Sequence, residues 1–411
     1  MKKVLVIGGG ASGLMASITA ARQGAKVTLL EKNRQTGKKL LVTGNGRCNF
    51  TNRNQELSYY RSENQEFVKE ALKAFSADQT VRFFEELGIL VKDCGGYLYP
   101  NSGQAASVAE VLRLETQRLQ IKTACNTEVL SVEKKDGLFY VKTEGWTYTS
   151  DAVILACGSM AAPGTGSTGD GYRFAESLGH RVIRPLPALT GLCASQKDCQ
   201  KLSGVRMEAK VTLQIDGAVC IEEQGEVQFA SYGLSGIPVF QVSRYVSQAL
   251  EEGKACEICL DLCPAYKEEK MIELLAERAE GTGNRSGTDV LLGMFPEKLS
   301  KVLLERAGIS GKKKRKDWTQ AEMQSLVRQI KSMRFTITKC RGYDQAQVCT
   351  GGVPLSQLKG ISMESALVPG LYFAGELLDV DGACGGYNLQ WAWTSGFLVG
   401  TCAARDGVKS Q

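Results

Sequence analysis

The hydrophobic pattern of the first thirty residues predicts a strand, a turn, a helix and a second strand. Residues 4–13 read Val-Leu-Val-Ile-Gly-Gly-Gly-Ala-Ser-Gly, an apolar run that enters a glycine-rich turn. An alanine-rich stretch with helical spacing follows over 14–23, and a second apolar run over 27–30 ends at Glu31. This order of elements is typical of the first unit of a Rossmann fold.

Each glycine of the Gly8-x-Gly10-x-x-Gly13 spacing has a mechanical reason. Gly8 permits a tight turn, Gly10 lets the backbone approach a pyrophosphate, and Gly13 lets the helix pack close to the strand. Glu31 stands where a carboxylate can accept hydrogen bonds from an adenosine ribose. We therefore predict a dinucleotide site, with a glycine-rich turn that holds no ligand as the alternative.

Alternation and helical periodicity predict further elements up to residue 157. The predicted helices are 65–75, 77–87 with Ser76 as its N-cap, and 104–119; the predicted strands are 89–92, 97–99, 128–134, 139–143, 146–149 and 152–157. The last four strands predict a β-meander that returns to the sheet.

The pattern changes near Leu189, which predicts an insertion. Strand-like runs lie at 206–215, 219–223, 226–230 and 255–262, a helix is predicted over 237–251, and 264–331 is mostly helical with a Gly/Ser/Thr-rich loop over 281–288. The predicted domains are 1–189, the first part of a nucleotide-binding domain; 190–263, an inserted β-rich domain; 264–334, a helical insert; and 335–411, the closing part of the first domain.

A second signature stands near the C-terminus. Residues 371–374 form a short apolar strand, Gly375 and Glu376 follow, and an apolar helical stretch over 389–404 comes after a turn with acidic residues. A strand, an acidic turn and a helix N-terminus suit the middle of an extended FAD, because the helix start places positive partial charge beside the flavin N1 edge. An ordinary strand–turn–helix packed on the sheet is the alternative.

The composition is that of a globular protein: 43% of 411 residues are hydrophobic and 23% are charged, and no apolar stretch is long enough to span a membrane. Lys2 and Lys3 run directly into the first strand, so we predict no cleavable signal and a cytoplasmic location. The 14 cysteines are scattered and are predicted to be reduced. Cys256, Cys259 and Cys263 lie in or after a predicted strand without a fourth ligand, and we predict no metal site.

Charge and histidine content restrict the chemistry. His180 is the only histidine, and a position at a helix end predicts a capping or packing role for it. The net charge of +6 is modest. The run Lys-Lys-Lys-Arg-Lys over 312–316 is predicted to be a solvated loop before a helix, with binding of RNA or of an acidic partner as the alternative.

The segment 164–169, Gly-Thr-Gly-Ser-Thr-Gly, repeats the spacing of the first glycine motif. Pro163 separates it from the preceding strand, and no acidic residue closes a second strand at the required distance. We predict a flexible loop that caps a helix over 170–178 beside the flavin, and no second dinucleotide domain. A nicotinamide donor would then dock only transiently on the flavin face.

Two longer motifs carry a family resemblance. Residues 43–52 read Thr-Gly-Asn-Gly-Arg-Cys-Asn-Phe-Thr-Asn, which resembles the TGNGRCN motif of the BaiN/RdsA-type bacterial FAD-dependent oxidoreductases, a group that includes aminoacetone oxidase-like flavoproteins. The closing segment 374–392 also resembles that family, and the match spans the whole chain. The resemblance implies an α/β protein with a Rossmann-like FAD-binding domain, an inserted β-rich domain and a helical subdomain.

The resemblance also implies a set of FAD contacts, which fall into five groups by the part of the cofactor or chain concerned. They are Gly8, Gly10, Ser12, Gly13, Glu31 and Lys32 at the pyrophosphate and adenosine ribose; Thr43, Gly44, Asn45 and Asn49 along the flavin and ribityl part; Val129 on the adenine side; Ala156, Cys157 and Gly158 after the returning strand; and Gly375, Glu376, Asp381, Gly386, Asn388 and Leu389 in the closing motif.

The family implies more than one reaction. NAD(P)H-driven reduction of a conjugated C=C bond in a bile-acid or steroid-like substrate is the predicted function, and oxidation of a small primary amine such as aminoacetone is the alternative; both transfer hydride through flavin N5. A flavin-containing RNA-modifying or RNA-binding protein is the alternative of another class. An NAD-only dehydrogenase conflicts with the closing motif, whereas a flavin-bound protein without turnover and the oligomeric state stay open.

Three residues beside the implied flavin edge are candidates for catalysis. Tyr387 is a candidate proton or hydrogen-bond donor, with simple packing of the helix start as the alternative. Arg47 is a candidate for orienting an anionic substrate or supporting flavin N1, and Cys48 is either a redox thiol or a small buried loop residue. Arg341 and Tyr343, where the insertion returns, are candidates for substrate binding by position alone.

Overall fold

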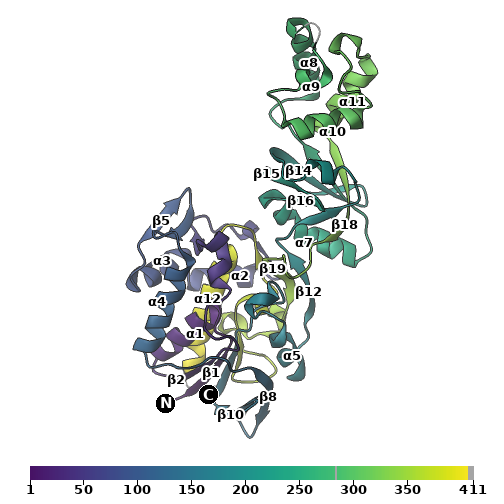
Figure 1. Ribbon diagram of the computed structural model, residues 1–411. Coiled ribbons are helices and arrows are strands. Elements are labelled where there is room, and N and C mark those ends of the chain that lie inside the picture. The colour runs from purple at the N-terminus through teal and green to yellow at the C-terminus, as the bar shows by residue number, and fades with distance from the viewer. Residues whose placement is uncertain (283–284, 406–411) are drawn as a thin grey trace. The chain divides into compact units, whose positions relative to one another are not determined.

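The computed structural model describes residues 1–282 and 285–405, which form two compact units (Figure 1). The first unit comprises Met1–Leu186 and the described residues from Gln347 onward, and the second comprises Pro187–Ala346. Each unit has its own cluster of buried hydrophobic side chains. The first unit is therefore built from both ends of the chain.

A five-stranded parallel sheet forms the centre of the first unit. Its strands, in sheet order, are β20 (Leu371–Phe373), β11 (Ala152–Leu155), β1 (Lys3–Ile7), β2 (Lys26–Leu30) and β7 (Lys122–Ala124). β11 and β20 are buried throughout, as near-continuous apolar runs are in parallel sheets. β1 lies between β2 and β11, so the turn after it leaves the sheet where the strand order reverses, the place where open α/β sheets bind ligands.

Helices α1 (Ala11–Arg22) and α12 (Tyr387–Ala404) pack side by side (Figure 1). Gly396 and Gly400, one turn apart on α12, make the close approach possible. A Cβ atom at Gly396 would lie 2.5 Å from the carbonyl oxygen of Ser12, and one at Gly400 would lie 2.5 Å from that of Ala16. The last helix is thereby held against the first.

The rest of the first unit surrounds this centre. Its other helices are α2 (Gln65–Ala74), α3 (Ala77–Glu86), α4 (Ala105–Arg118), α5 (Asp170–Ser177) and the 3-10 turns η1 (Leu40–Gly46), η2 (Leu57–Tyr59), η3 (Pro163–Thr165), η5 (Leu355–Gln357), η6 (Gly360–Ser362) and η7 (Gly375–Leu377). Its small sheets are β8 (Val129–Lys135), β9 (Leu138–Thr143) and β10 (Thr147–Ser150); β3 (Thr51–Asn52), β6 (Tyr97–Pro100) and β5 (Val91–Cys94); β4 (Tyr60–Arg61) with β21 (Asp381–Gly382); and β12 (Ile183–Ala188) with β19 (Val348–Gly352).

Two local predictions in this unit are confirmed. The predicted meander is the antiparallel sheet β8–β9–β10, which leads into β11. Ser76 caps α3 in a capping box: its hydroxyl accepts from the Gln79 N–H at 3.4 Å, and the Gln79 side chain accepts from the Ser76 N–H at 2.8 Å. A cap of this kind contributes about 1 kcal/mol.

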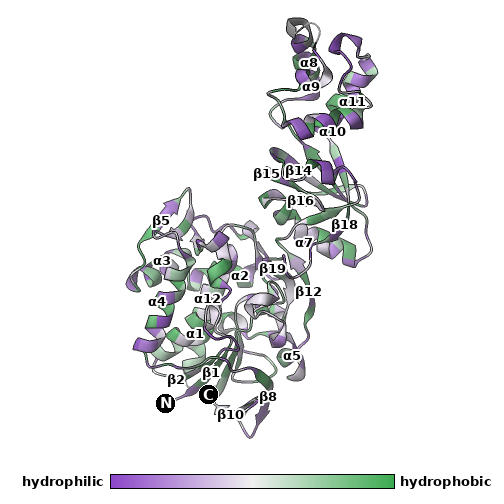
Figure 2. Cartoon of the chain, viewed as in Figure 1, coloured by the Kyte–Doolittle hydropathy of each residue, from purple (hydrophilic) through white to green (hydrophobic). Residues whose placement is uncertain are grey.

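The second unit contains a closed six-stranded barrel and a group of helices. The barrel strands, in order, are β13 (Leu192–Ala194), β16 (Gly233–Ser235), β15 (Ala218–Ala230), β14 (Arg206–Ile215), β17 (Cys256–Asp261) and β18 (Met333–Cys340), and the helices are α6 (Cys199–Leu202), α7 (Ile237–Glu251), α8 (Glu268–Thr282), α9 (Gly287–Val290), α10 (Glu297–Ala307) and α11 (Gln320–Lys331), with the 3-10 turn η4 (Arg315–Asp317). α10 and α11 carry alternating hydrophobic and hydrophilic patches (Figure 2), as expected of helices with one buried face.

The structure differs from the predicted elements of this unit in two places. The strands predicted at 219–223 and 226–230 are one strand, β15, because Gly225 does not end the ladder but pairs with Ala209 on β14. The loop predicted at 281–288 is shorter, since α8 continues to Thr282 and α9 begins at Gly287; residues 283–284 lie outside the described part of the chain.

The four predicted domain segments remain a prediction at their boundaries. β18 belongs to the barrel by pairing with β13 and β17, although the predicted closing part of the first domain began at residue 335. Fold class itself is confirmed: an α/β Rossmann-type unit, a β-rich barrel and a helical region. Within residues 1–282 and 285–405, no helix combines the length and the apolar character needed to cross a membrane.

Candidate functional site

In the first glycine turn, two glycines are required by close backbone contacts, and a third faces open space. A Cβ atom at Gly8, where φ is +103°, would lie 2.4 Å from the carbonyl oxygen of Ala156, and one at Gly13 would lie 1.8 Å from that of Gly8. At Gly10 a Cβ atom would meet no described atom within 4 Å. The space beside Gly10 is therefore available to a ligand.

The N-terminus of α1 faces that space without a side-chain cap. Gly10 is the N-cap residue and cannot supply a capping oxygen. The first N–H groups of a helix lack partners within the helix and carry positive partial charge, which favours an anion such as a pyrophosphate. An open glycine and an uncapped helix start together fit the phosphates of a dinucleotide.

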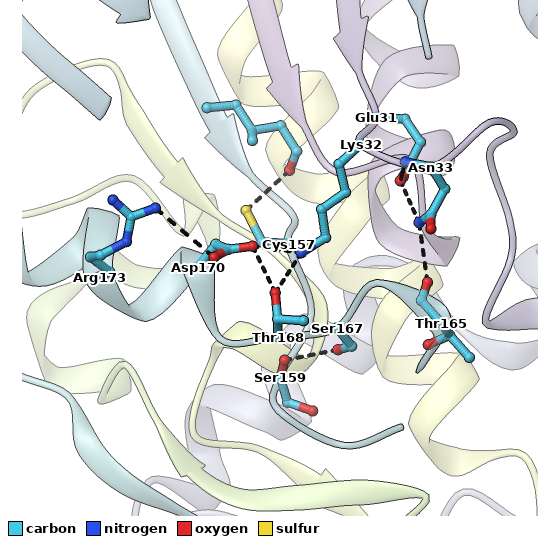
Figure 3. A network of polar contacts seen from close by, with 11 residues as sticks. Glu31, Lys32, Asn33, Cys157, Ser159, Thr165, Ser167, Thr168, Asp170 and Arg173 are labelled. Atoms are coloured by element: carbon cyan, nitrogen blue, oxygen red, sulfur yellow. Dashed lines mark hydrogen bonds and ion pairs between the residues drawn. The ribbon is translucent and has the colours of Figure 1, made fainter. Parts of the chain in front are cut away.

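Glu31, at the end of β2, is buried and firmly held (Figure 3). Its Oε2 accepts from the Gly9 N–H at 2.8 Å, and its Oε1 accepts from the backbone and side-chain N–H groups of Asn33, both at 2.7 Å. Three fixed donors orient the carboxylate next to the glycine turn, where a ribose would lie in a Rossmann site. Asn33 was not predicted as a site residue, because nothing in the glycine motif marks it.

The closing motif reaches the same turn. Gly375, with φ +71°, lies against Ser12, since a Cβ atom there would be 2.5 Å from the Ser12 hydroxyl oxygen. The next residue, Glu376, pairs with Lys39 at 2.7 Å and accepts a hydrogen bond from Ser159 at 2.9 Å. These contacts join segments more than 200 residues apart, and no short-range signal marked Lys39 or Ser159.

The loop over 43–49 has an unusual backbone. Gly44 and Asn45 adopt the left-handed conformation, and Thr43 braces the loop by donating from its hydroxyl to the Leu40 carbonyl at 2.6 Å. Asn49 is buried, and its Oδ1 has no hydrogen-bond partner among the described residues. A buried orphan acceptor fits a donor supplied by a ligand.

The N-terminus of α12 lies beside Asn49. A Cβ atom on its N-cap, Gly386, would be 3.0 Å from Asn49 Oδ1 and 2.7 Å from the Thr51 backbone, and among the described residues no side-chain cap of this helix is seen. The site residues of the first unit thus include two uncapped helix starts, those of α1 and α12. An extended dinucleotide with phosphates at one and a flavin at the other matches this pair.

Three other predicted contact residues have structural roles within the first unit. Asn388 uses its side-chain amide to hold a turn, accepting from the Gly382 N–H and donating to the Gly382 carbonyl, both at 2.8 Å. Asp381 is buried in β21, and Leu389 packs against the core. Whether they touch the cofactor stays a prediction.

The segment after β11 packs on the first turn. Ala156 contacts Gly8, and the thiol of Cys157 lies 3.5 Å from the carbonyl oxygen of Ile7. Burial raises the pKa of Cys157 to about 12, so this thiol is protonated at neutral pH. Gly158 has φ +75° and faces Ser167, and Val129 is buried at the start of β8.

The three catalytic candidates differ in exposure. Arg47 is exposed, and its guanidinium lies 5.3 Å from the ring centre of Tyr99. Tyr387 is buried and stacks on Tyr59 with ring centres 4.6 Å apart; burial raises its pKa, which makes it a weak acid. Cys48 is fully buried, and burial raises its pKa to about 12, which argues for a loop residue over a redox thiol.

Two other predicted residues have contacts within their own units. Arg341 lies over the Tyr232 ring at 4.5 Å within the second unit. His180 is buried after α5, with its Nε2 2.8 Å from the Ser365 hydroxyl oxygen, in agreement with a packing role.

Fold and site together define a Rossmann-type protein built to hold an extended dinucleotide. The chain belongs to the HI0933-like family, whose Rossmann-domain model matches residues 2–402. The family resemblance drawn from residues 43–52 and 374–392 is thereby confirmed.

Two curated relatives align over nearly the whole chain. A 3-dehydro-bile acid delta(4,6)-reductase of Clostridium scindens is 41% identical over 408 residues, covering 98% of this chain and 99% of the relative. A ribosomal RNA dihydrouridine synthase of Haemophilus influenzae is 31% identical over 410 residues, covering 98% of each.

The solved structure of a 3-ketosteroid-delta4-(5alpha)-dehydrogenase from Rhodococcus jostii RHA1 shares the fold, with a TM-score of 0.51 and 15% identity over 98% of this chain and 97% of that one. The protein is an oxidoreductase, and family, fold and site support FAD as its cofactor.

Proposed function

We propose that this protein is an FAD-dependent reductase that adds hydrogen across a C=C bond conjugated to a carbonyl in a small hydrophobic substrate of the bile-acid or steroid class, with NAD(P)H as electron donor. The observation that carries the proposal is the 41% identity, over 98% of the chain, to a 3-dehydro-bile acid delta(4,6)-reductase. Similarity of that extent covers both units of the fold.

Reduction of a conjugated C=C bond requires a hydride at the β-carbon and a proton at the α-carbon. FAD, when bound, supplies the hydride at N5 of its ring. The remaining tasks belong to the protein: the starts of α1 and α12 bind the phosphates and the flavin end, and Glu31 holds the ribose. Asn49 offers its orphan oxygen to the flavin half of the site.

Arg47 is the residue best placed to orient a substrate carbonyl or carboxylate, because its guanidinium is exposed and has Tyr99 beneath it. Replacement by alanine should raise the KM for an acidic steroid at least about 10-fold, and kcat should fall less. If Arg47→Ala and Arg47→Lys lowered kcat equally and left KM unchanged, Arg47 would not be the residue that orients the substrate.

Tyr387 is the candidate proton donor, although stacking on Tyr59 and a raised pKa favour a packing role. Tyr387→Phe keeps the ring and removes the hydroxyl, so unchanged turnover of the variant would assign the residue to packing.

The proposal is tested by product analysis. The protein, reconstituted with FAD and supplied with NADH or NADPH without oxygen, should convert a 3-keto-4,6-diene steroid into a product heavier by two hydrogens. Failure with such substrates but oxidation of aminoacetone would select the amine oxidase instead.

Reduction of uridine in RNA is a second candidate, favoured by 31% identity to two ribosomal RNA dihydrouridine synthases. The C5=C6 bond of uracil is also conjugated to a carbonyl, so the chemistry would be the same. Residues 297–341 hold thirteen Lys and Arg residues against four Asp and Glu. Such a basic segment suits a phosphate backbone.

The structure shows that the basic run over 312–316 is only partly exposed. Lys313 pairs with Glu322 at 2.7 Å, and Arg315 is buried with its guanidinium over the Trp318 ring. Three lysines of the run, at 312, 314 and 316, are exposed. If RNA is the substrate, joint replacement of the three lysines by glutamine should lower the affinity for RNA and make that affinity less dependent on salt concentration. If RNA is not the substrate, the replacement should leave steroid reduction unchanged.

A further inference from the structure

The second glycine segment, 163–169, lies against the residues that follow β2 (Figure 3). Asn33 donates from its side-chain amide to the Thr165 carbonyl at 3.1 Å. Gly166, with φ +100°, faces the same amide so closely that a Cβ atom there would lie 2.4 Å from it. The glycine therefore serves contact with Asn33 and leaves no space for a phosphate.

A second tie joins the far end of the segment to Lys32. The Lys32 ammonium lies 2.6 Å from Asp170 Oδ2 and also contacts the Thr168 hydroxyl, which itself donates to Asp170 at 2.8 Å. Burial alone would raise the pKa of Asp170, but hydrogen bonds from Lys32 and Thr168 and the charge of Lys32 lower it. The Asp170 carboxylate is therefore ionised at neutral pH.

Both contacts are made by residues that directly follow Glu31, the acidic residue of the nucleotide motif. Asn33 holds the Glu31 carboxylate and the Thr165 carbonyl with one amide group. On its inner side the segment is fixed by Ser167, which donates to the Ser159 carbonyl at 2.8 Å. The segment is thus anchored at the ribose end of the site described above.

We propose that Lys32, Asn33 and Asp170 are positioning residues that hold residues 163–169 as a cover over the adenosine end of the cofactor site. The inference rests on the proposed FAD function. It assigns control of cofactor release to residues 163–169. It also gives a role to the second glycine motif, which binds no phosphate of its own.

The test is the rate at which FAD leaves the holoenzyme, followed by the flavin fluorescence that appears on dilution. Asp170→Asn and Lys32→Met should each speed release about 5- to 10-fold, and the double variant should be no faster than either, because both remove the same tie. Asn33→Ala should add a further increase. Lys142→Met, which removes a 2.7 Å ion pair with Glu133 in the β8–β9 hairpin, is the matched control and should leave release unchanged.

Each other outcome overturns the inference. Release unchanged in Asp170→Asn and in Asn33→Ala means that the segment does not retain the cofactor. Faster release in Lys32→Met alone assigns Lys32 to direct cofactor contact. A wild-type protein that takes up no FAD removes the proposed function together with the cover. Thermal unfolding of each apoprotein separates loss of the tie from loss of the fold.

Discussion

The chain carries the same glycine spacing twice, and the two copies use it for opposite purposes. In the first copy, Gly8 and Gly13 are required by backbone contacts, and Gly10 faces open space. In the second copy, Gly164 faces open space, and Gly166 is pressed against a side chain. Of the two copies, the first combines an open middle glycine with the start of a long helix, which is the arrangement that suits a phosphate.

The distinction was partly accessible from the sequence. Pro163 before the second copy and the missing acid after it argued against a dinucleotide site, and the structure places α5 directly after Gly169 as predicted. The contact between Gly166 and Asn33 joins segments 133 positions apart, and no local pattern encodes such a pairing. The first copy and its helix were predictable because their periodicity is local.

The most severe change should be Gly13→Ala, which tests the backbone requirement of the first copy. A Cβ atom 1.8 Å from the Gly8 carbonyl oxygen cannot be accommodated unless α1 moves away from β1. We expect loss of FAD binding by more than about 100-fold, or failure to fold. Flavin absorbance and circular dichroism measure the two effects. Gly164→Ala, at an open position of the second copy, should be harmless in both assays.

Gly10→Ala should separate an effect on FAD binding from an effect on folding. Because no described atom lies within 4 Å of the new Cβ and the φ of −78° suits alanine, the apoprotein should keep its melting temperature. FAD affinity should fall at least about 10-fold, since the methyl group enters the space assigned to the pyrophosphate. An unchanged dissociation constant for FAD would mean that the phosphates lie elsewhere.

Gly166→Ala should have an intermediate effect of a different kind. The new methyl group meets the movable end of Asn33, and the φ of +100° strains any residue with a Cβ. We expect about 1–3 kcal/mol of lost stability in denaturant unfolding and a few-fold faster release of FAD. If Gly166→Ala instead abolished binding as Gly13→Ala does, the contrast between the two copies would be lost.

His180 gives the smallest effect, at the other end of the helix that the second copy starts. Burial lowers the pKa of His180 from its usual 6.5, and the side chain of Gln357 partly offsets this effect. A depressed pKa means that the unfolded chain binds the proton more readily, so stability is full above about pH 6.5 and falls as the pH drops. The loss attributable to His180 should reach at most about 2 kcal/mol at pH 5. His180→Gln should flatten that slope, and an identical slope in the variant would contradict the prediction.

Only part of the closing motif could be predicted from the sequence. The turn and the helical stretch over 389–404 followed from composition and spacing, and the family resemblance implied their cofactor role. Gly375 against Ser12, and Lys39 against Glu376, emerged only from the packing of α12 on α1. The two strands predicted at 219–223 and 226–230 were wrong as separate strands, because Gly225 lies inside one long paired strand.

The most direct test of the proposed function is an anaerobic absorbance titration of the FAD-reconstituted protein. NADH or NADPH should bleach the flavin bands, and one equivalent of a 3-keto-4,6-diene steroid should restore them while the diene gains two hydrogens. Absence of flavin bands after reconstitution, or bleached bands that the steroid never restores, would contradict the proposed reductase.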